Sequence, residues 1–314
     1  MAALPALDDH VGNPFALGDG AAYRRWRDWK LATAPRTVDD LIVDVANPWA
    51  LTQEERLALL DRIARANMAV YRAPPGTDDA ALPVALGRQL GLVRLDANWL
   101  ADDDGVSRIA VSEHSDGRGG FIPYTDRAIR WHTDGYYHPP ERRIHGMILH
   151  CVRAAAAGGV NRLLDHEMAY IALRDQDPAH IVALMAADAM SIPAREGPDA
   201  TDGEGVARAL QTGPVFSLDA DNRLHMRYTA RTRSIAWKAD AATRVAVAQL
   251  EAYLEADATP MLTLRLTPGM GIVANNVLHE RSAFIDDPAH PRLLLRARFL
   301  DRVDTGAVQP WRNG

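Results

Sequence analysis

The chain has 314 residues, 47% of them hydrophobic, and a formal net charge of −6 at pH 7. The negative charge argues against a nucleic-acid partner, because binding to nucleic acid requires a basic surface. The sequence contains no run of about 18 apolar residues, so no membrane-spanning helix is predicted. Cys151 is the only cysteine, which excludes an intrachain disulfide and a zinc ribbon and is typical of a cytoplasmic protein. A small-molecule substrate is the expected partner.

The first half of the chain predicts helices and strands in a mixed order. Thr52 and Glu55 have the spacing of a capping box ahead of a helix over 56–67. A strand over 68–73 and a helix over 81–91 follow, and two strands over 126–135 and 142–152 flank a loop with two prolines.

The second half is richer in strand patterns. Residues 165–189 predict two helical segments that break near Pro178, and 214–219 with 224–228 predict a hairpin around the turn residues 220–222. A helix is expected over 241–257, and strands over 261–267, 271–278 and 292–300. This pattern favours an α+β fold with a mainly β core, an antiparallel barrel or jelly roll with flanking and inserted helices.

No linker, repeat or low-complexity tract divides the chain. We therefore expect a single domain over 1–314, with residues 1–40 as an N-terminal extension that packs on it. A homo-oligomer is left open.

A candidate metal motif lies in "RWHTDGYYH", residues 130–138. His132 and Asp134 would point to one face if the strand continued through both. His114 and Asp116 repeat the spacing, but in a glycine-rich polar stretch that is more typical of a solvated loop. The first pair is therefore preferred. The other histidines are interpreted as surface or satisfied core residues.

The C-terminal third supplies a second histidine and interior arginines. His279 ends an apolar run, and period-2 geometry places Arg292, Arg296 and Arg298 on one strand face. A buried guanidinium is costly without an anion, and arginine binds a carboxylate bidentately. Two histidines and one carboxylate with open positions are the arrangement used for non-haem Fe(II).

The order His132, Asp134, His279, Arg292, Arg296 resembles the TauD/TfdA family of Fe(II)- and 2-oxoglutarate-dependent dioxygenases. The likeness extends from about Met68 through "GRQLG", "GGVNRLLD" and "NNVLHERSAF" to "RLLLRARF". Some stretches also resemble the glutarate 2-hydroxylase branch. The family fold implied is a double-stranded β-helix, which is a form of jelly roll.

The resemblance implies a role for each matching residue. His132, Asp134 and His279 would be the catalytic iron ligands, Arg292 would hold the distal carboxylate of 2-oxoglutarate, and Arg296 would lie near its metal-chelating end. Asn161 stands where many relatives have Thr or Ser beside this co-substrate, and Glu280 follows the distal histidine where Gly is common. The implied reaction uses O₂ to hydroxylate a C–H bond of a small organic acid or amino-acid-like substrate, releasing succinate and CO₂.

The substrate pocket is predicted from residues near these motifs. Arg227 and Arg231, with Tyr136 and Tyr137, would bind a small anion, and Arg233 is a weaker candidate. An aromatic cage of Tyr136, Tyr137, Tyr228 and Trp237 for a betaine-like quaternary ammonium is an alternative. Two alternative functions are a zinc-dependent hydrolase that uses the same triad and a non-enzymatic binding protein with a jelly-roll fold.

Overall fold

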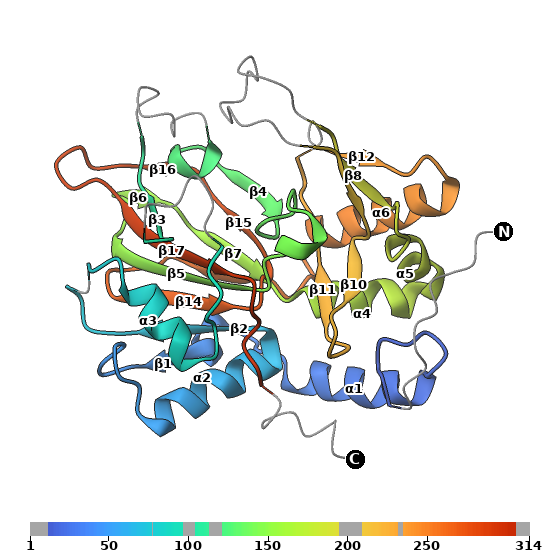
Figure 1. The fold of residues 1–314 in the computed structure, drawn as a ribbon, viewed down its shortest axis with the longest axis horizontal. Coiled ribbons are helices and arrows are strands. Elements are labelled where there is room, and N and C mark those ends of the chain that lie inside the picture. Colours follow the sequence, from blue (N-terminus) through green and yellow to red (C-terminus); the bar gives the residue numbers. More distant parts are fainter. Residues whose placement is uncertain are drawn as a thin grey trace.

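Two antiparallel sheets enclose the core of the protein in the computed structural model, which describes residues 12–76, 78–96, 104–112, 121–194, 209–231 and 235–305 (Figure 1). The larger sheet has the order β1 (Ile42–Asp44), β2 (Met68–Arg72), β14 (Met270–Ala274), β5 (Gly146–Arg153), β17 (Leu293–Phe299) and β3 (Ser107–Ile109). The smaller has the order β13 (Leu262–Leu264), β7 (Asn161–Leu164), β15 (Leu278–Arg281) and β4 (Ile129–His132). The β1–β2 pair alone is parallel within these two sheets.

Apolar side chains fill the space between the two sheets. Ile272 and Leu294 of the larger sheet belong to the same buried cluster as Leu163 and Leu262 of the smaller one. The predicted mainly β jelly roll is therefore confirmed.

Helices pack against the larger sheet and form a second group at one side of the molecule (Figure 1). Helix α2 (Gln53–Ala66) and α3 (Leu82–Gln89) pack on the larger sheet, where Leu59 and Leu86 meet Leu295. The smaller sheet packs with α1 (Gly20–Thr33), α4 (His166–Gln176), α5 (Pro178–Leu184) and α6 (Ala241–Glu255), in a cluster that contains Trp26 and Leu278. None of the helices in the described part of the chain has the length and apolar character needed to cross a bilayer.

Three short sheets complete the strand set. They are the hairpin β10 (Phe216–Leu218) with β11 (Leu224–Met226), the sheet β12 (Ala236–Trp237), β8 (Met190–Ile192) and β9 (Gln211–Gly213), and the pair β16 (Phe284–Ile285) with β6 (Ala157–Gly158). The hairpin prediction and the helix break at Pro178 are confirmed. So is the capping box, in which the Thr52 side chain accepts from the Glu55 N–H.

The prediction of one strand over 271–278 was wrong. β14 ends at Ala274 in the larger sheet, and β15 begins at Leu278 in the smaller one. Asn276, between them, has a positive φ of 50°, a conformation that asparagine adopts more readily than most residues. The apolar run therefore crosses from one sheet to the other.

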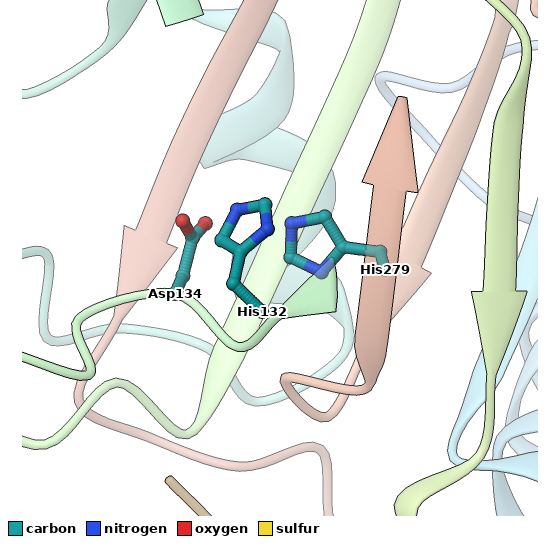
Figure 2. A group of neighbouring side chains, drawn as sticks. All are labelled: His132, Asp134 and His279. Carbon is teal, nitrogen blue, oxygen red and sulfur yellow. The ribbon is translucent and has the colours of Figure 1, made fainter. Parts of the chain in front are cut away.

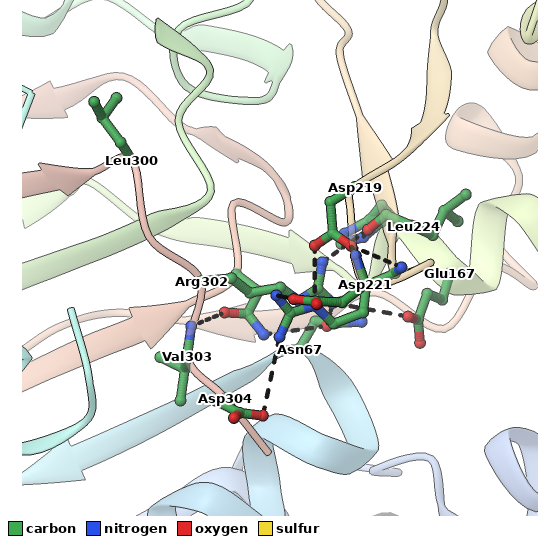
Figure 3. Close-up of polar contacts among 12 residues, drawn as sticks. Asn67, Glu167, Asp219, Asp221, Leu224, Leu300, Arg302, Val303 and Asp304 are labelled. Atoms are coloured by element: carbon green, nitrogen blue, oxygen red, sulfur yellow. Dashed lines mark hydrogen bonds and ion pairs between the residues drawn. The ribbon is translucent and has the colours of Figure 1, made fainter. Parts of the chain in front are cut away.

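Buried charges tie the outer elements to this core. The Nζ of Lys30 in α1 lies 2.6 Å from the Asp165 carboxylate and 2.5 Å from that of Glu167, and the Lys30 side chain is 1% exposed. Arg302 donates to the Leu224 carbonyl and to the Asn67 side chain, so it links the hairpin to the end of α2 (Figure 3).

Candidate active site

Two neighbouring strands and the turn after one of them bring three candidate ligands together. His132 is the last residue of β4 and pairs directly with His279 of β15. Asp134 lies two residues beyond the end of β4, in a turn. The sequence argument placed both His132 and Asp134 on one strand, so for Asp134 it was wrong about the element. Figure 2 shows the three side chains converging.

The three side chains have a spacing that suits a metal ion. One ligand atom from each lies within 4.8 Å of the others, and the two imidazole centroids are 4.2 Å apart. His132 Nδ1 donates to the Arg130 carbonyl and His279 Nδ1 to the Val277 carbonyl, each at 2.9 Å. These bonds fix the tautomer that leaves Nε2 unprotonated, as a metal-binding histidine requires.

The electrostatics of the site favour the protonation states of metal ligands. Burial, with neighbouring His279, lowers the pKa of His132 to about 3, so its imidazole is neutral at pH 7. Burial alone would raise the pKa of Asp134, but Arg296, Arg298 and the two histidines hold it below its usual value. A neutral histidine and an ionised carboxylate are the forms that bind a cation.

Asp134 has one carboxylate oxygen without a partner. Oδ1 accepts from Arg296 Nη1 at 3.3 Å, whereas Oδ2 is buried and makes no hydrogen bond with any described residue. Such a group is costly in a folded protein, and a metal ion beside it would satisfy it. The residues present therefore fit a divalent cation with open coordination positions.

A pocket adjoins the triad and contains the arginines expected from the sequence. His132, His279, Asn161, Arg292 and Arg296 all line it. Arg292 is 4% exposed, and burial lowers its pKa. In the part of the chain that the structure describes, its Nη1 has no hydrogen-bond partner. Its guanidinium lies 4.9 Å from the centroid of the Phe284 ring. A buried cation of this kind suits an anionic ligand.

Asn161 lies at the end of β7 that faces the pocket. It is 7% exposed, and its Nδ2 donates to the Leu264 carbonyl at 3.4 Å. Its side-chain Oδ1 makes no hydrogen bond with a described residue, so this oxygen can accept one beside Arg292. A role in co-substrate binding stays a prediction.

Arg281 is a pocket residue that the sequence argument missed. It lies on β15 two residues after His279 and is 5% exposed. Its Nη2 donates to the carbonyls of Thr125 and Arg127, which fastens the segment before β4 against the sheet. The signal available was period-2 alternation, which places residue 281 on the face of His279.

Glu280 points to the other face of the same strand. Its carboxylate pairs with Arg162 of β7, which lies opposite in the sheet register and over the Trp131 ring at 5.4 Å. The unusual residue after the distal histidine thus has a cross-strand partner.

The predicted substrate arginines flank a residue that pairs with His132. Thr229 forms a β-bridge with His132, and Arg227 and Arg231 lie two residues before and after Thr229. Arg227 is 7% exposed, and its guanidinium donates to the carbonyls of Tyr136, Met190 and Gln211. It therefore braces the turn after Asp134, and direct substrate contact by Arg227 or Arg231 stays a prediction.

The aromatic candidates form two contacting pairs. The rings of Tyr136 and Tyr137 meet edge to face at 5.2 Å, and those of Tyr228 and Trp237 lie 6.5 Å apart. Tyr137 also accepts from Arg298 at 3.3 Å, and Arg298 in turn pairs with Asp96 at 2.6 Å. A cationic guanidinium already occupies one side of the proposed cage.

Several other candidates from the sequence are placed away from the chemistry or outside the described residues. His150 bonds to Tyr71 in the core, and Cys151 is fully buried with its pKa raised to about 11 by burial. His114, Asp116 and Arg233 lie outside the described residues. Within those residues, the triad is the one group of three or more His, Cys, Asp or Glu side chains with metal-binding spacing.

Sequence comparison identifies relatives. Residues 35–298 match the family described as "Taurine catabolism dioxygenase TauD, TfdA family". A uridine-5'-phosphate dioxygenase from Amycolatopsis sp is 32% identical over 199 residues, which are 60% of this chain and 66% of that protein. One from Streptomyces sp is 32% identical over 197 residues, 61% and 66% of the respective chains. The matches thus span slightly less than two thirds of the length of these relatives.

Solved structures share the fold at low identity. An asparagine oxygenase in complex with Fe(II), hydroxyasparagine and succinate is 18% identical, with a TM-score of 0.51 over 87% of this chain and 90% of that one. The non-heme iron oxygenase OrfP in complex with Fe, succinate and hydroxyarginine is also 18% identical, with a TM-score of 0.56 over 79% and 81%.

Proposed function

This chain belongs to the TauD, TfdA dioxygenase family, and we propose that His132, Asp134 and His279 bind Fe(II) in it while Arg292 and Arg296 bind 2-oxoglutarate. The family places it among the Fe(II)- and 2-oxoglutarate-dependent dioxygenases. Bound iron would supply the oxidation of a C–H bond by O₂, coupled to the conversion of 2-oxoglutarate to succinate and CO₂.

One observation carries this proposal: the two histidines of the triad and two buried arginines line the same pocket. A dicarboxylate would place one carboxylate against Arg292, which lacks a full set of partners, and the other end near the triad. Arg296 would lie near the metal-chelating end of 2-oxoglutarate, since it contacts Asp134. The protein's own contribution is to hold these groups in place and to keep the pocket apolar through residues such as Leu149 and Leu294.

A zinc-dependent hydrolase could use the same three ligands with a metal-bound water. It would have no need for two arginines buried beside the metal, each of which is costly without an anion. The buried Arg292 is thus the observation that favours the dioxygenase over the hydrolase.

The primary substrate of this proposal is a small organic acid or an amino-acid-like compound. Arg231 follows by two residues Thr229, which bridges His132, and this proximity in the chain supports a role for its guanidinium in holding a substrate carboxylate. The asparagine and arginine hydroxylation products in the solved neighbours give the same substrate class some support. The likeness to the glutarate 2-hydroxylase branch makes a dicarboxylate a further member of the class to test.

A nucleoside 5'-monophosphate is a second candidate. It is favoured by the uridine-5'-phosphate dioxygenases, which are more similar in sequence to this chain than the solved neighbours are. A phosphate, like a carboxylate, is recognised by guanidinium groups, so Arg231 serves either candidate. The quaternary-ammonium alternative is less favoured, because Arg298 lies against Tyr137.

The test is substrate-stimulated succinate release by the iron-loaded protein. The panel contains amino acids, small dicarboxylates, nucleoside 5'-monophosphates and betaines, each supplied with 2-oxoglutarate and O₂. Stimulation by one anionic class identifies the substrate class, and product mass increased by one oxygen confirms hydroxylation. Stimulation by betaines alone would reject the anionic substrate. Failure of the protein to bind 2-oxoglutarate in the presence of Fe(II) would reject the dioxygenase proposal as a whole.

A further inference from the structure

The third proposed ligand, Asp134, lies where the sheet no longer holds the backbone. The two histidines are fixed by the pairing of β4 with β15. Asp134 follows the end of β4, so no strand partner is available for its N–H and C=O. Something else must set its distance from the histidines, because a ligand on an unrestrained turn would lose much of its preorganisation.

The side chain of Asn276 takes the place of that missing strand. Its Oδ1 accepts from the Asp134 N–H at 2.7 Å, and its Nδ2 donates to the Asp134 carbonyl at 3.0 Å. The amide thus offers Asp134 one acceptor and one donor, as a neighbouring peptide group would. A third bond, from Nδ2 to the Ile144 carbonyl at 2.6 Å, holds the far end of the same loop.

Asn276 is also placed to couple this loop to His279. It lies three residues before His279, in the turn where the chain crosses from β14 to β15, and is 1% exposed. Its φ of 50° directs the chain through that turn. One residue therefore joins the segment that contains His279 to the backbone of Asp134, although Asn276 and Asp134 are 142 positions apart in the sequence.

We propose that Asn276 is a positioning residue that fixes the Asp134 carboxylate relative to the two histidines and so sets the affinity of the site for Fe(II). This inference rests on the proposed function, since it assumes that the triad binds iron. Within the described part of the chain, the Asn276 side chain bonds to backbone atoms of Asp134 and Ile144 and does not line the pocket, so it would act through the backbone of Asp134.

The neighbouring residue provides a matched control. Asn275 is 3% exposed and also makes buried amide bonds, but to other parts of the chain: its Oδ1 accepts from the Val303 N–H at 3.0 Å, and its Nδ2 donates to Asn67. Loss of Asn275 should lower stability without moving Asp134. Asn222, in the β10–β11 turn, has a φ of 57° and controls for the backbone effect of replacing an asparagine of positive φ by glycine.

The experiment compares Asn276→Gly with Asn275→Ala and Asn222→Gly. Glycine keeps the positive φ at 276 without strain and removes only the side chain. Fe(II) affinity is measured by anaerobic titration of the metal-free protein, with Mn(II) as a second probe, and thermal unfolding of the metal-free protein is measured in parallel. The visible charge-transfer band of the Fe(II) and 2-oxoglutarate complex gives an independent spectroscopic readout.

We expect Asn276→Gly to lose about 10- to 100-fold in metal affinity, the range typical for residues that orient ligands, and to shift the charge-transfer band. The two controls should keep wild-type metal affinity, even if Asn275→Ala unfolds at a lower temperature. Wild-type affinity in Asn276→Gly, or an equal loss in Asn275→Ala, would overturn the inference.

If Asn276→Gly does not fold, Asn276→Asp is measured in its place. The aspartate side chain keeps the acceptor for the Asp134 N–H but loses the donors to the Asp134 and Ile144 carbonyls. Unchanged metal affinity in Asn276→Asp would then count against the inference. If the wild-type protein itself does not bind Fe(II), the proposed function fails, and the inference fails with it for that distinct reason.

Discussion

Arg296 Nη1 lies 3.3 Å from Asp134 Oδ1, and both side chains are at least nine-tenths buried. The pair joins strand β17 of the larger sheet to the turn after β4 of the smaller one. Because Arg296 engages one carboxylate oxygen and leaves the other without a partner, the ion pair orients Asp134 without neutralising its capacity to bind a cation.

Replacement of His132, Asp134 or His279 by Ala should abolish activity and lower Fe(II) affinity by roughly 100-fold or more, beyond the usual loss for an outer-shell residue. Anaerobic titration of each variant with Fe(II) measures the effect. His114→Ala and Asp116→Ala, which alter the rival motif, should retain iron affinity. Loss of iron in those variants with retention in His132→Ala would show that the wrong motif was chosen.

Arg292→Ala should weaken 2-oxoglutarate binding by roughly 2 to 5 kcal/mol, because a buried carboxylate loses its charged partner. The charge-transfer band, titrated with 2-oxoglutarate, reports the affinity. Arg292→Lys should restore only part of it, since a point charge does not reproduce the guanidinium fork. Unchanged affinity in Arg292→Ala would refute this assignment.

Stability should fall as the pH is lowered from 6.5 to about 4, in part because of His145. Burial, with nearby Arg302, lowers the pKa of this residue from 6.5 to about 4, so the unfolded chain takes up its proton first and the folded state loses stability through this window. The contribution of His145 is at most about 3.4 kcal/mol, since a tenfold change in proton affinity is worth about 1.4 kcal/mol.

Urea unfolding at pH 7 and pH 4.5 measures this effect. His145→Gln, which cannot take up a proton, should show a smaller pH dependence than the wild type. His290→Gln is the control, because the His290 side chain is 79% exposed. An unaltered pH dependence in His145→Gln would contradict the prediction.

Lys30→Met should destabilise the fold by roughly 3 to 5 kcal/mol, because Asp165 and Glu167 would be left as buried carboxylates without their cation. Denaturant unfolding measures the change. Lys238→Met removes an exposed pair with Asp188 at 2.9 Å and should leave the unfolding free energy unchanged within error. Equal effects in the two variants would show that the buried ion pairs of Lys30 with Asp165 and Glu167 do not stabilise the fold.

Local sequence patterns predicted the elements better than the connections between them. The capping box at Thr52, the break at Pro178 and the hairpin were predicted correctly because each depends on a few adjacent residues. The strand over 271–278 was wrong because hydrophobic alternation does not show that a chain leaves one sheet for another. The pair Asn275–Asn276 was the available signal, since asparagine favours turns.

The candidate site was predicted in its residue types but not in its supporting contacts. Spacing indicated His132 and Asp134 as candidates, strand alternation indicated a buried Arg292, and the family resemblance joined them with His279. Asn276 could not be found in this way, because it bonds to backbone atoms of a segment 142 positions away. Strand alternation from His279 could indicate that Arg281 faces the pocket, but not that it donates to carbonyls of the segment before β4. Arg227 was assigned to the substrate from its charge, whereas its three carbonyl contacts depend on tertiary packing.

The burial of Cys151 makes the chain suited to thiol-labelling kinetics. Its side chain is fully enclosed in the middle of the larger sheet, and burial keeps the thiol protonated at neutral pH. A thiol reagent can therefore react only after that sheet opens, so the labelling rate reports the free energy of opening. Since Cys151 and Arg292 line one small cavity, 2-oxoglutarate bound at Arg292 should slow the labelling of an otherwise unmodified protein.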